Sequence, residues 1–277
     1  MLLARLPSWS PACPPSSIDP VSGMAVHASG LLLILCTLYC IAPLKSLISW
    51  HPLFMMIGLC GFSLQGIIVF NRYSSLVPSS PTHRKFTLHW LLQTLGLLSI
   101  LAGCAVIYKV KSDGNKGHVT TWHGCLGYVF ILYGLLQSLF GVVKSYAFLR
   151  PWLKLRTSNQ IHAISGAVFF SLGCLVTALG LQSDWFQHKV LVDVIQDQGV
   201  RLLIGYFLAF LLGLLAMVIL KQVYDKYFSS AEGSKNTSSA QVKRTNHDRD
   251  AHRDGTLPWV LATKKILSAM LVNERMV

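Results

Sequence analysis

Four histidines lie within long apolar stretches of this 277-residue chain. Ionisable side chains are costly inside a membrane, and those that occur there are functional candidates. Successive members of the set are 38, 34 and 39 residues apart, so each one falls near the start of a different stretch. They are His51, His89, His123 and His162.

The direction of the chain sorts these histidines into two pairs. If each stretch is a helix that crosses a membrane, alternate helices run in the same direction, so His51 and His123 lie at one depth. His89 and His162 then share a depth near the opposite face. Two imidazoles from different helices can bind one haem iron from above and below. The sequence therefore predicts two haems, with His51/His123 and His89/His162 as the axial ligands.

Small residues and the absence of other motifs agree with this chemistry. A glycine follows each histidine by one or two turns on the same helix face, where it would let a backbone approach a flat macrocycle. Zinc would need ligands that converge on one point, and no catalytic residue is expected beyond the haems. The glycines are Gly58, Gly96, Gly127 and Gly166.

The composition is that of a membrane protein. The chain is 52% hydrophobic and 13% charged, whereas soluble domains carry about a quarter charged residues. Six stretches without Asp, Glu, Lys or Arg are each close to the length of about 20 residues that spans a bilayer. We expect an all-α polytopic membrane protein with six transmembrane helices, of which the second to fifth form a four-helix haem-binding core. The stretches are Val21–Leu44, Ser46–Asn71, Phe86–Tyr108, Val119–Val143, Thr157–Ser183 and Leu202–Leu220.

Outside these stretches, the sequence predicts a Pro/Ser-rich leader at 1–20, a membrane domain at 21–227 and a polar disordered tail at 228–256. Residues 257–277 are either an amphipathic helix on the membrane surface or a weakly structured end. The net charge of +13 lies at the membrane edges and in the tail, so nucleic acid is not an expected partner. The side of the membrane that holds both termini carries 18 Lys and Arg residues, and the other side carries 6. Basic residues are in excess on the cytoplasmic side, so both termini are predicted to be cytoplasmic.

The sequence around the histidines resembles the cytochrome b561 family, over about Val21–Tyr227. The resemblance is closest to the animal subgroup called cytochrome b561 domain-containing proteins. It rests on Trp50-His51-Pro52, on Lys85 before His89-Trp90 and Gln93, on Trp122-His123-Gly124, and on His162 followed by Gly166.

This resemblance implies that both haems are haem b and that electrons pass from cytosolic ascorbate to ferric iron or monodehydroascorbate on the lumenal or extracellular side. The basic residues Lys85, Arg84 and Arg156, near His89 and His162, are then expected to attract ascorbate, and His118 is expected on the acceptor side. Arg72 does not align cleanly with the Tyr-Arg that larger animal members carry after the second helix. The subgroup also points to a membrane of the endoplasmic reticulum or of endolysosomes or vesicles, and is compatible with a homodimer.

Two other functions remain open. One is a haem-free six-helix transporter or scaffold, in which the histidines anchor helix ends. Transporters usually carry charged residues near mid-membrane or broken helices, and these spans contain no charged residue. The other is a haem-binding redox sensor without turnover, which the sequence does not exclude.

Overall fold

The computed structural model describes residues 20–42, 46–71, 75–145 and 155–229, with the side chains of 20–22, 155 and 229 left aside. In this part of the chain the secondary structure is entirely helical. The chain divides into two units, Met1–Tyr227 and Phe228–Val277, and the first contains all six spans up to Tyr227. Nearly all of the predicted leader and tail, with the predicted amphipathic segment at 257–277, lie outside the described residues.

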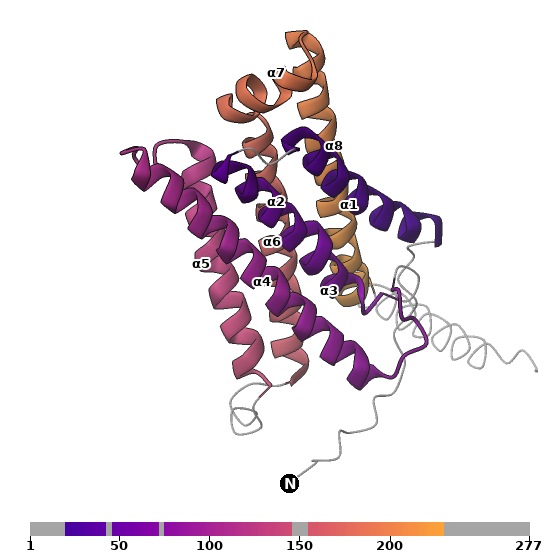
Figure 1. Cartoon of the computed structure of the whole chain (residues 1–277). Coiled ribbons are helices and arrows are strands. Elements are labelled where there is room, and N and C mark those ends of the chain that lie inside the picture. The colour runs from indigo at the N-terminus through magenta and orange to yellow at the C-terminus, as the bar shows by residue number, and fades with distance from the viewer. Residues whose placement is uncertain (1–19, 43–45, 72–74, 146–154, 230–277) are drawn as a thin grey trace, which may run out of the picture. The chain divides into compact units, whose positions relative to one another are not determined.

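Within the described residues, six helical segments are long and apolar enough to cross a membrane, which confirms the predicted all-α, six-span fold. The second span is made of four consecutive pieces, and the sixth continues from an α-helix into a π-helical turn. The spans are formed by α1 (Pro20–Ile41), by η1 (Leu47–Ser49), α2 (Trp50–Met56), η2 (Ile57–Ser63) and α3 (Leu64–Ile68), by α4 (Thr82–Asp113), by α5 (Trp122–Val143), by α6 (Leu155–Leu181), and by α8 (Gln198–Tyr224) with η5 (Asp225–Ser229) (Figure 1).

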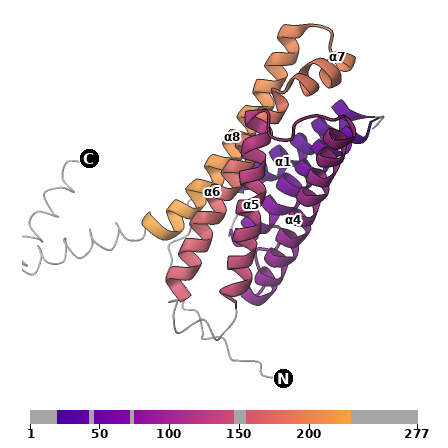
Figure 2. The same cartoon turned by 90° about the vertical axis from the view of Figure 1, so that its left-hand side faces the viewer.

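The second to fifth spans pack as a closed ring. Helix α2 packs on α4, α4 on α5, α5 on α6, and α6 returns to η2 of the second span. Helices α1 and α8 lie outside this ring, where α1 contacts the second span and α8, and α8 packs along α6 (Figures 1 and 2). The four spans that carry the histidines are therefore the four that enclose a common interior.

The second span contains a π-helix that the hydrophobic pattern did not predict. A π-helix widens the turn and is typical of functional segments; here η2 brings Gly58 against Gly96 of α4. A Cβ on Gly58 would lie 2.9 Å from the Gly96 carbonyl oxygen. These two glycines were expected to face a haem beside their histidines, but they face each other where two helix backbones touch.

Helix α4 is longer than the charge-free stretch that predicted it, extending to Thr82 at one end and Asp113 at the other. Basic side chains near the ends of a span can reach the membrane surface while their stems stay in the apolar layer, so a charge did not end the helix. In the last turn, Lys109 Nζ forms an ion pair with Asp113 at 2.6 Å.

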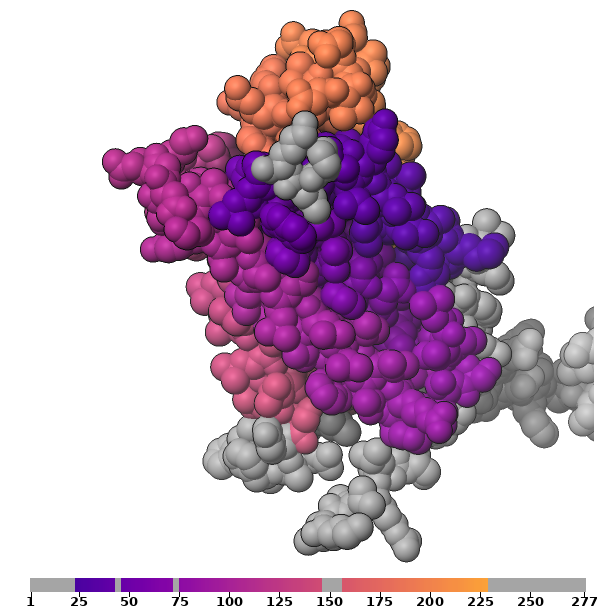
Figure 3. Space-filling view, in the orientation of Figure 1, coloured from indigo at the N-terminus to yellow at the C-terminus, as the bar shows by residue number. Residues whose placement is uncertain are grey.

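The connection between α6 and α8 folds at one end of the bundle. It contains a π-helical turn, η4 (Phe186–Val190), and the short α7 (Leu191–Val194), which Figure 3 shows as an orange protrusion. Asp197 caps α8 by accepting a hydrogen bond from the Val200 amide at 2.8 Å. The buried Arg201 side chain donates to the carbonyl oxygens of Ile195 and Gln196 at 2.9 and 2.7 Å, which fixes the connection.

Candidate functional site

The structure brings the four histidines together as two pairs. His51 of α2 faces His123 of α5 with 6.1 Å between ring centroids and 81° between ring planes. His89 of α4 faces His162 of α6 at 6.2 Å and 77°. These are the pairs expected from helix direction, and each joins two different helices of the ring.

Three of the histidines are oriented by main-chain carbonyl groups at Nδ1. A carbonyl oxygen only accepts hydrogen bonds, so the imidazole hydrogen must lie on Nδ1, and the lone pair on Nε2 is left available. Metal-binding histidines are commonly held in this way. His51 donates to Gly103 O at 2.9 Å, His89 to Gly66 O at 2.7 Å and His123 to Val176 O at 2.9 Å.

His162 is held differently, by the side chain of Gln137 on α5. The amide nitrogen of Gln137 lies 3.2 Å from His162 Nδ1 and donates to the His162 carbonyl oxygen at 2.8 Å. Ser165 donates to the other end of the amide, Oε1, at 2.7 Å. A metal bound at Nε2 would leave the hydrogen on Nδ1, and the amide would then have to turn its oxygen toward that hydrogen. The sequence analysis missed Gln137, although its spacing of 14 residues from His123 places both on one face of α5.

Two other glycines lie directly against the imidazoles. A Cβ on Gly180 of α6 would lie 2.9 Å from His123 Cε1, and a Cβ on Gly141 of α5 would lie 3.1 Å from His162 Cε1. Each glycine follows the histidine of its own helix by 18 residues, which is five full turns and therefore the same face. Helices α5 and α6 therefore each carry a histidine near one end and, near the other end, a glycine that leaves space for the histidine ring of the other helix.

The geometry of each pair fits one haem iron. Two metal–nitrogen bonds of about 2 Å each, with the ring radii added, account for a centroid separation of about 6 Å. Within the described residues no three His, Cys, Asp or Glu side chains come together, so each pair offers two nitrogen ligands. Two axial nitrogens are what a haem iron takes from a protein.

The pairs lie close to the two ends of the spans. From His123 to Gly141, beside His162, helix α5 rises about 27 Å at 1.5 Å per residue, nearly the bilayer core of about 30 Å. Trp122 and Trp90, each next to a histidine, are 78% and 58% exposed. Exposed tryptophans gather at membrane interfaces, so their positions agree with pairs that lie just inside the two surfaces.

Each pair also has one lysine that acts electrostatically on both of its rings. Lys111 does so at His51 and His123, and Lys144 does so at His89 and His162. Lys144 follows the last residue of α5 and donates from Nζ to Asn159 Oδ1 at 3.0 Å. Its burial and the nearby charge of Lys226 lower the pKa of Lys144 from 10.5 to about 8.

The predicted donor residues lie at the end of the bundle that holds His89 and His162. Lys85 is in the first turns of α4 and donates from Nζ to the Pro78 carbonyl at 2.8 Å. Arg84 beside it and Arg156 at the start of α6 are exposed. Three more basic residues of the loops at this end lie outside the described residues, namely Arg72, Arg150 and Lys154.

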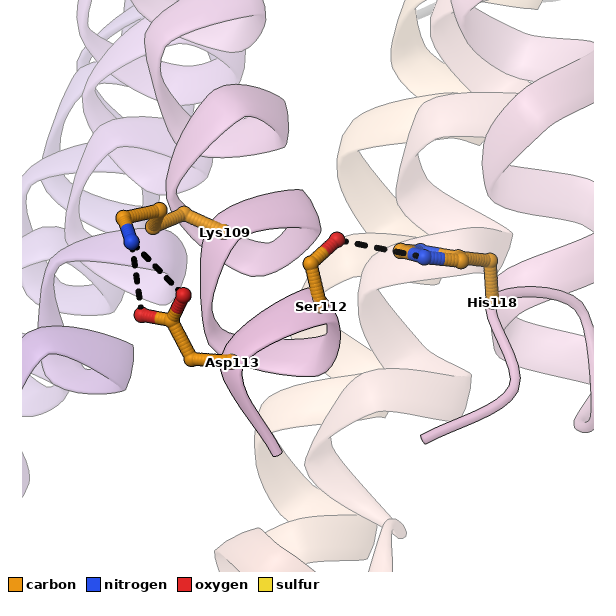
Figure 4. Close-up of polar contacts among 4 residues, drawn as sticks. All are labelled: Lys109, Ser112, Asp113 and His118. Carbon is orange, nitrogen blue, oxygen red and sulfur yellow. Dashed lines mark hydrogen bonds and ion pairs between the residues drawn. The ribbon is translucent and has the colours of Figure 1, made fainter. Parts of the chain in front are cut away.

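The predicted acceptor residue His118 is fixed against the end of α4. Its ring stacks on Tyr108 at 4.6 Å, and its Nε2 lies 3.4 Å from Ser112 Oγ (Figure 4). Lys111 donates to the carbonyl oxygens of Gly117 and His118, both at 3.1 Å. His118 therefore lies beside the lysine that acts on His51 and His123.

Comparison with known proteins gives one consistent result. Residues 50–187, which carry all four histidines, match the family described as eukaryotic cytochrome b561. The bovine transmembrane reductase CYB561D2 is 33% identical over 212 residues, which cover 76% of this chain and 90% of the relative. The human protein of that name is 33% identical over 174 residues, covering 63% of this chain and 78% of the relative.

Proposed function

This chain belongs to the eukaryotic cytochrome b561 family, and on that premise we propose that it carries electrons through two b-type haems from cytosolic ascorbate to ferric iron or monodehydroascorbate. Its matched relatives are named transmembrane reductases. Family membership and six membrane-length helices make it an integral multi-pass membrane protein that transfers electrons across the membrane. The cofactor number, the donor and the acceptor are the proposed part.

One observation carries the proposal: two separate histidine pairs, each with rings about 6 Å apart, at opposite ends of the same four-helix ring. A single pair could serve storage or sensing within one face. Two pairs near opposite surfaces support a path across the apolar layer, which neither substrate would have to enter.

Bound haem would supply reversible one-electron transfer at each pair. The chain's own groups bind and orient it: the Nε2 atoms serve as ligands, and the Nδ1 hydrogen bonds fix the ring planes. Gly141 and Gly180 leave room for the imidazoles, while the apolar side chains of the spans keep water away. An electron crosses the apolar layer without a bound substrate, so the spans need no ionisable group at mid-membrane to bind one.

We assign the His89/His162 pair to the cytoplasmic side because basic residues are in excess there. Lys85, Arg84 and Arg156 lie at the starts of the two helices that carry these histidines, where their charges would attract ascorbate, an anion. Lys85 would have to give up its bond to Pro78 O, an exposed bond that water can replace. At the other end, His118 and Lys111 are the polar groups that could meet the acceptor.

The test is an absorption spectrum of the purified protein, with haem per chain quantified before and after ascorbate is added. We expect two b-type haems per chain, both reduced by ascorbate. His51→Ala and His89→Ala should each remove one haem. His83→Ala is the matched control, because His83 is exposed on the same helix as His89 and belongs to neither pair.

Two results would contradict the proposal. A protein that stays colourless after expression with added haem would favour a haem-free transporter or scaffold, in which the histidines anchor helix ends. A protein that binds two haems which ascorbate does not reduce would favour the redox sensor.

A further inference from the structure

A bridge between α5 and α6 lies one turn outward from the His162 ring. Lys144, directly after the last residue of α5, follows Gly141 by three residues, and Asn159 precedes His162 by three residues on α6, so each lies on the same face as its neighbour. The hydrogen bond from Lys144 Nζ to Asn159 Oδ1, 3.0 Å long, therefore joins the two helices just beyond the contact between Gly141 and His162.

The ammonium of Lys144 bonds to a neutral group, the amide oxygen of Asn159. No carboxylate pairs with it in the described part of the chain, where the recorded ion pairs are Lys109–Asp113 and Lys221–Asp225. A second cation, Lys226, acts on it and lies over the rings of Phe70 and Tyr227 at 5.9 and 5.3 Å. A partly buried cation is unfavourable without an anion beside it.

The opposite pair also has a lysine near it, although Lys111 donates to the carbonyl oxygens of Gly117 and His118 in the loop after α4. Lys111 acts on both His51 and His123, as Lys144 acts on both His89 and His162. One lysine at each membrane surface thus accompanies each pair of rings. A haem is itself amphipathic, since its apolar body suits the bundle interior and its two carboxylates need a cation or water at the outer edge.

We propose that Lys144, positioned by Asn159, binds a carboxylate of the haem held between His89 and His162. This inference rests on the proposed function. The same anion chemistry could come from the electron donor, but Arg84 and Arg156 are exposed to an approaching molecule, whereas Lys144 is partly buried and bonded across two helices.

The test compares haem loss with and without the carboxylates. His51→Ala leaves only this site, and in that background Lys144 is changed to Met or, to keep the charge, to Arg. Each protein is loaded with haemin or with haemin dimethyl ester, and transfer to excess apomyoglobin is timed. Lys221→Met is the control, because Lys221 is a basic residue of α8 already paired with Asp225.

We expect Lys144→Met to lose haemin about tenfold faster, as for one hydrogen bond between charged groups. Lys144→Arg should stay close to the parent, and the control should not change. With the dimethyl ester, Lys144→Met and the parent should lose the macrocycle at the same rate, because the two changes remove the same interaction.

Three results would overturn the assignment. Equal rates with haemin would show that Lys144 makes no contact, and equal acceleration with haemin and its ester would show a merely structural role. Unchanged haem loss with a higher ascorbate requirement for reduction would assign Lys144 to the donor.

If His51→Ala does not fold, the two phases of haem loss from the full protein give the same comparison. A parent that takes up no haem would contradict the proposed function itself.

Discussion

Each imidazole of the two pairs is held at Nδ1, and two of the four have a second contact. Its Nδ1 is held by a carbonyl group or, for His162, by the Gln137 amide. In α5 and α6 the Cε1 edge also rests on a glycine of the neighbouring helix. The first contact sets the direction of the ring plane, and the second sets how closely the ring approaches the opposite helix.

A methyl group at either glycine should therefore displace a histidine. Gly180→Ala places Cβ 2.9 Å from His123 Cε1, and Gly141→Ala places it 3.1 Å from His162 Cε1. We expect each variant to lose most of one haem, measured as haem per chain. Alanine favours a helix by about 1 kcal/mol over glycine, so a loss would be steric. Gly213→Ala, with no atom within 4 Å of its Cβ, is the control and should keep both haems.

Lys144 should make the stability of the haem-free protein depend on pH. Its pKa is lowered from 10.5 to about 8, first by burial and then by Lys226. The charged form is thus disfavoured in the folded state, and the cost is full below pH 8 and fades as the pH rises toward 10.5. The midpoint of thermal unfolding should rise over this window relative to Lys144→Met. A constant difference between the two proteins would contradict the lowered pKa.

The sequence identified the four histidines predicted to be ligands, but not the residues that hold their rings in place. His51, His89, His123 and His162 stand out because a polar residue in an apolar span is rare. Gln137 and the glycines at 141 and 180 do not, since glutamine and glycine occur in membrane helices for many reasons. The 18-residue spacing gains meaning only when α5 and α6 are known to be antiparallel neighbours.

Among the elements, the second span differs most from an ordinary helix. Its π-helical segment η2 packs on α1, α4 and α6, and its Gly58 meets the backbone of α4 at Gly96. This close approach fixes the spacing between the helix of His51 and the helix of His89.

Gly58→Ala should loosen this junction. The new Cβ would lie 2.8 Å from Ile100 Cγ1 and 2.9 Å from Gly96 O, an overpacking that typically costs about 1–3 kcal/mol. We expect a lower midpoint of thermal unfolding. Gly61→Ala in the same π-helix is the matched control, because its Cβ meets its nearest atom at 3.6 Å. Equal unfolding midpoints for the two variants would show that the helices can move apart at Gly58 without a loss of stability.

Apolar stretches predicted the number and order of the spans but not their ends or their internal form. Helix α4 runs beyond Phe86–Tyr108 because lysine and arginine stems pack along a helix. The π-helix is invisible to composition, since it adds a residue to a turn without changing its polarity.

For the molecule as a whole, the uneven distribution of basic residues predicts one orientation, with both termini in the cytoplasm. In sealed microsomes, an impermeant thiol reagent should label Ser234→Cys of the tail directly, and Lys116→Cys, between α4 and α5, only after detergent is added. Both are made with the native cysteines replaced. The sequon Asn236-Thr237-Ser238 should also remain without a glycan. The reverse labelling pattern would invert the assigned donor and acceptor sides.

Because α5 and α6 each contact the histidine of the other helix, the order in which they are synthesised determines when each site can form. The site of His51 and His123 needs Val176 and Gly180 from the far end of α6, while the site of His89 and His162 needs Gln137 and Gly141 from the far end of α5. All residues of the His89/His162 site have left the ribosome once His162 has, whereas the His51/His123 site also waits for Val176 and Gly180. Cofactor capture at the first of these sites can therefore come earlier, and a nascent chain arrested between His162 and Val176 would carry the residues of that centre but not those of the other.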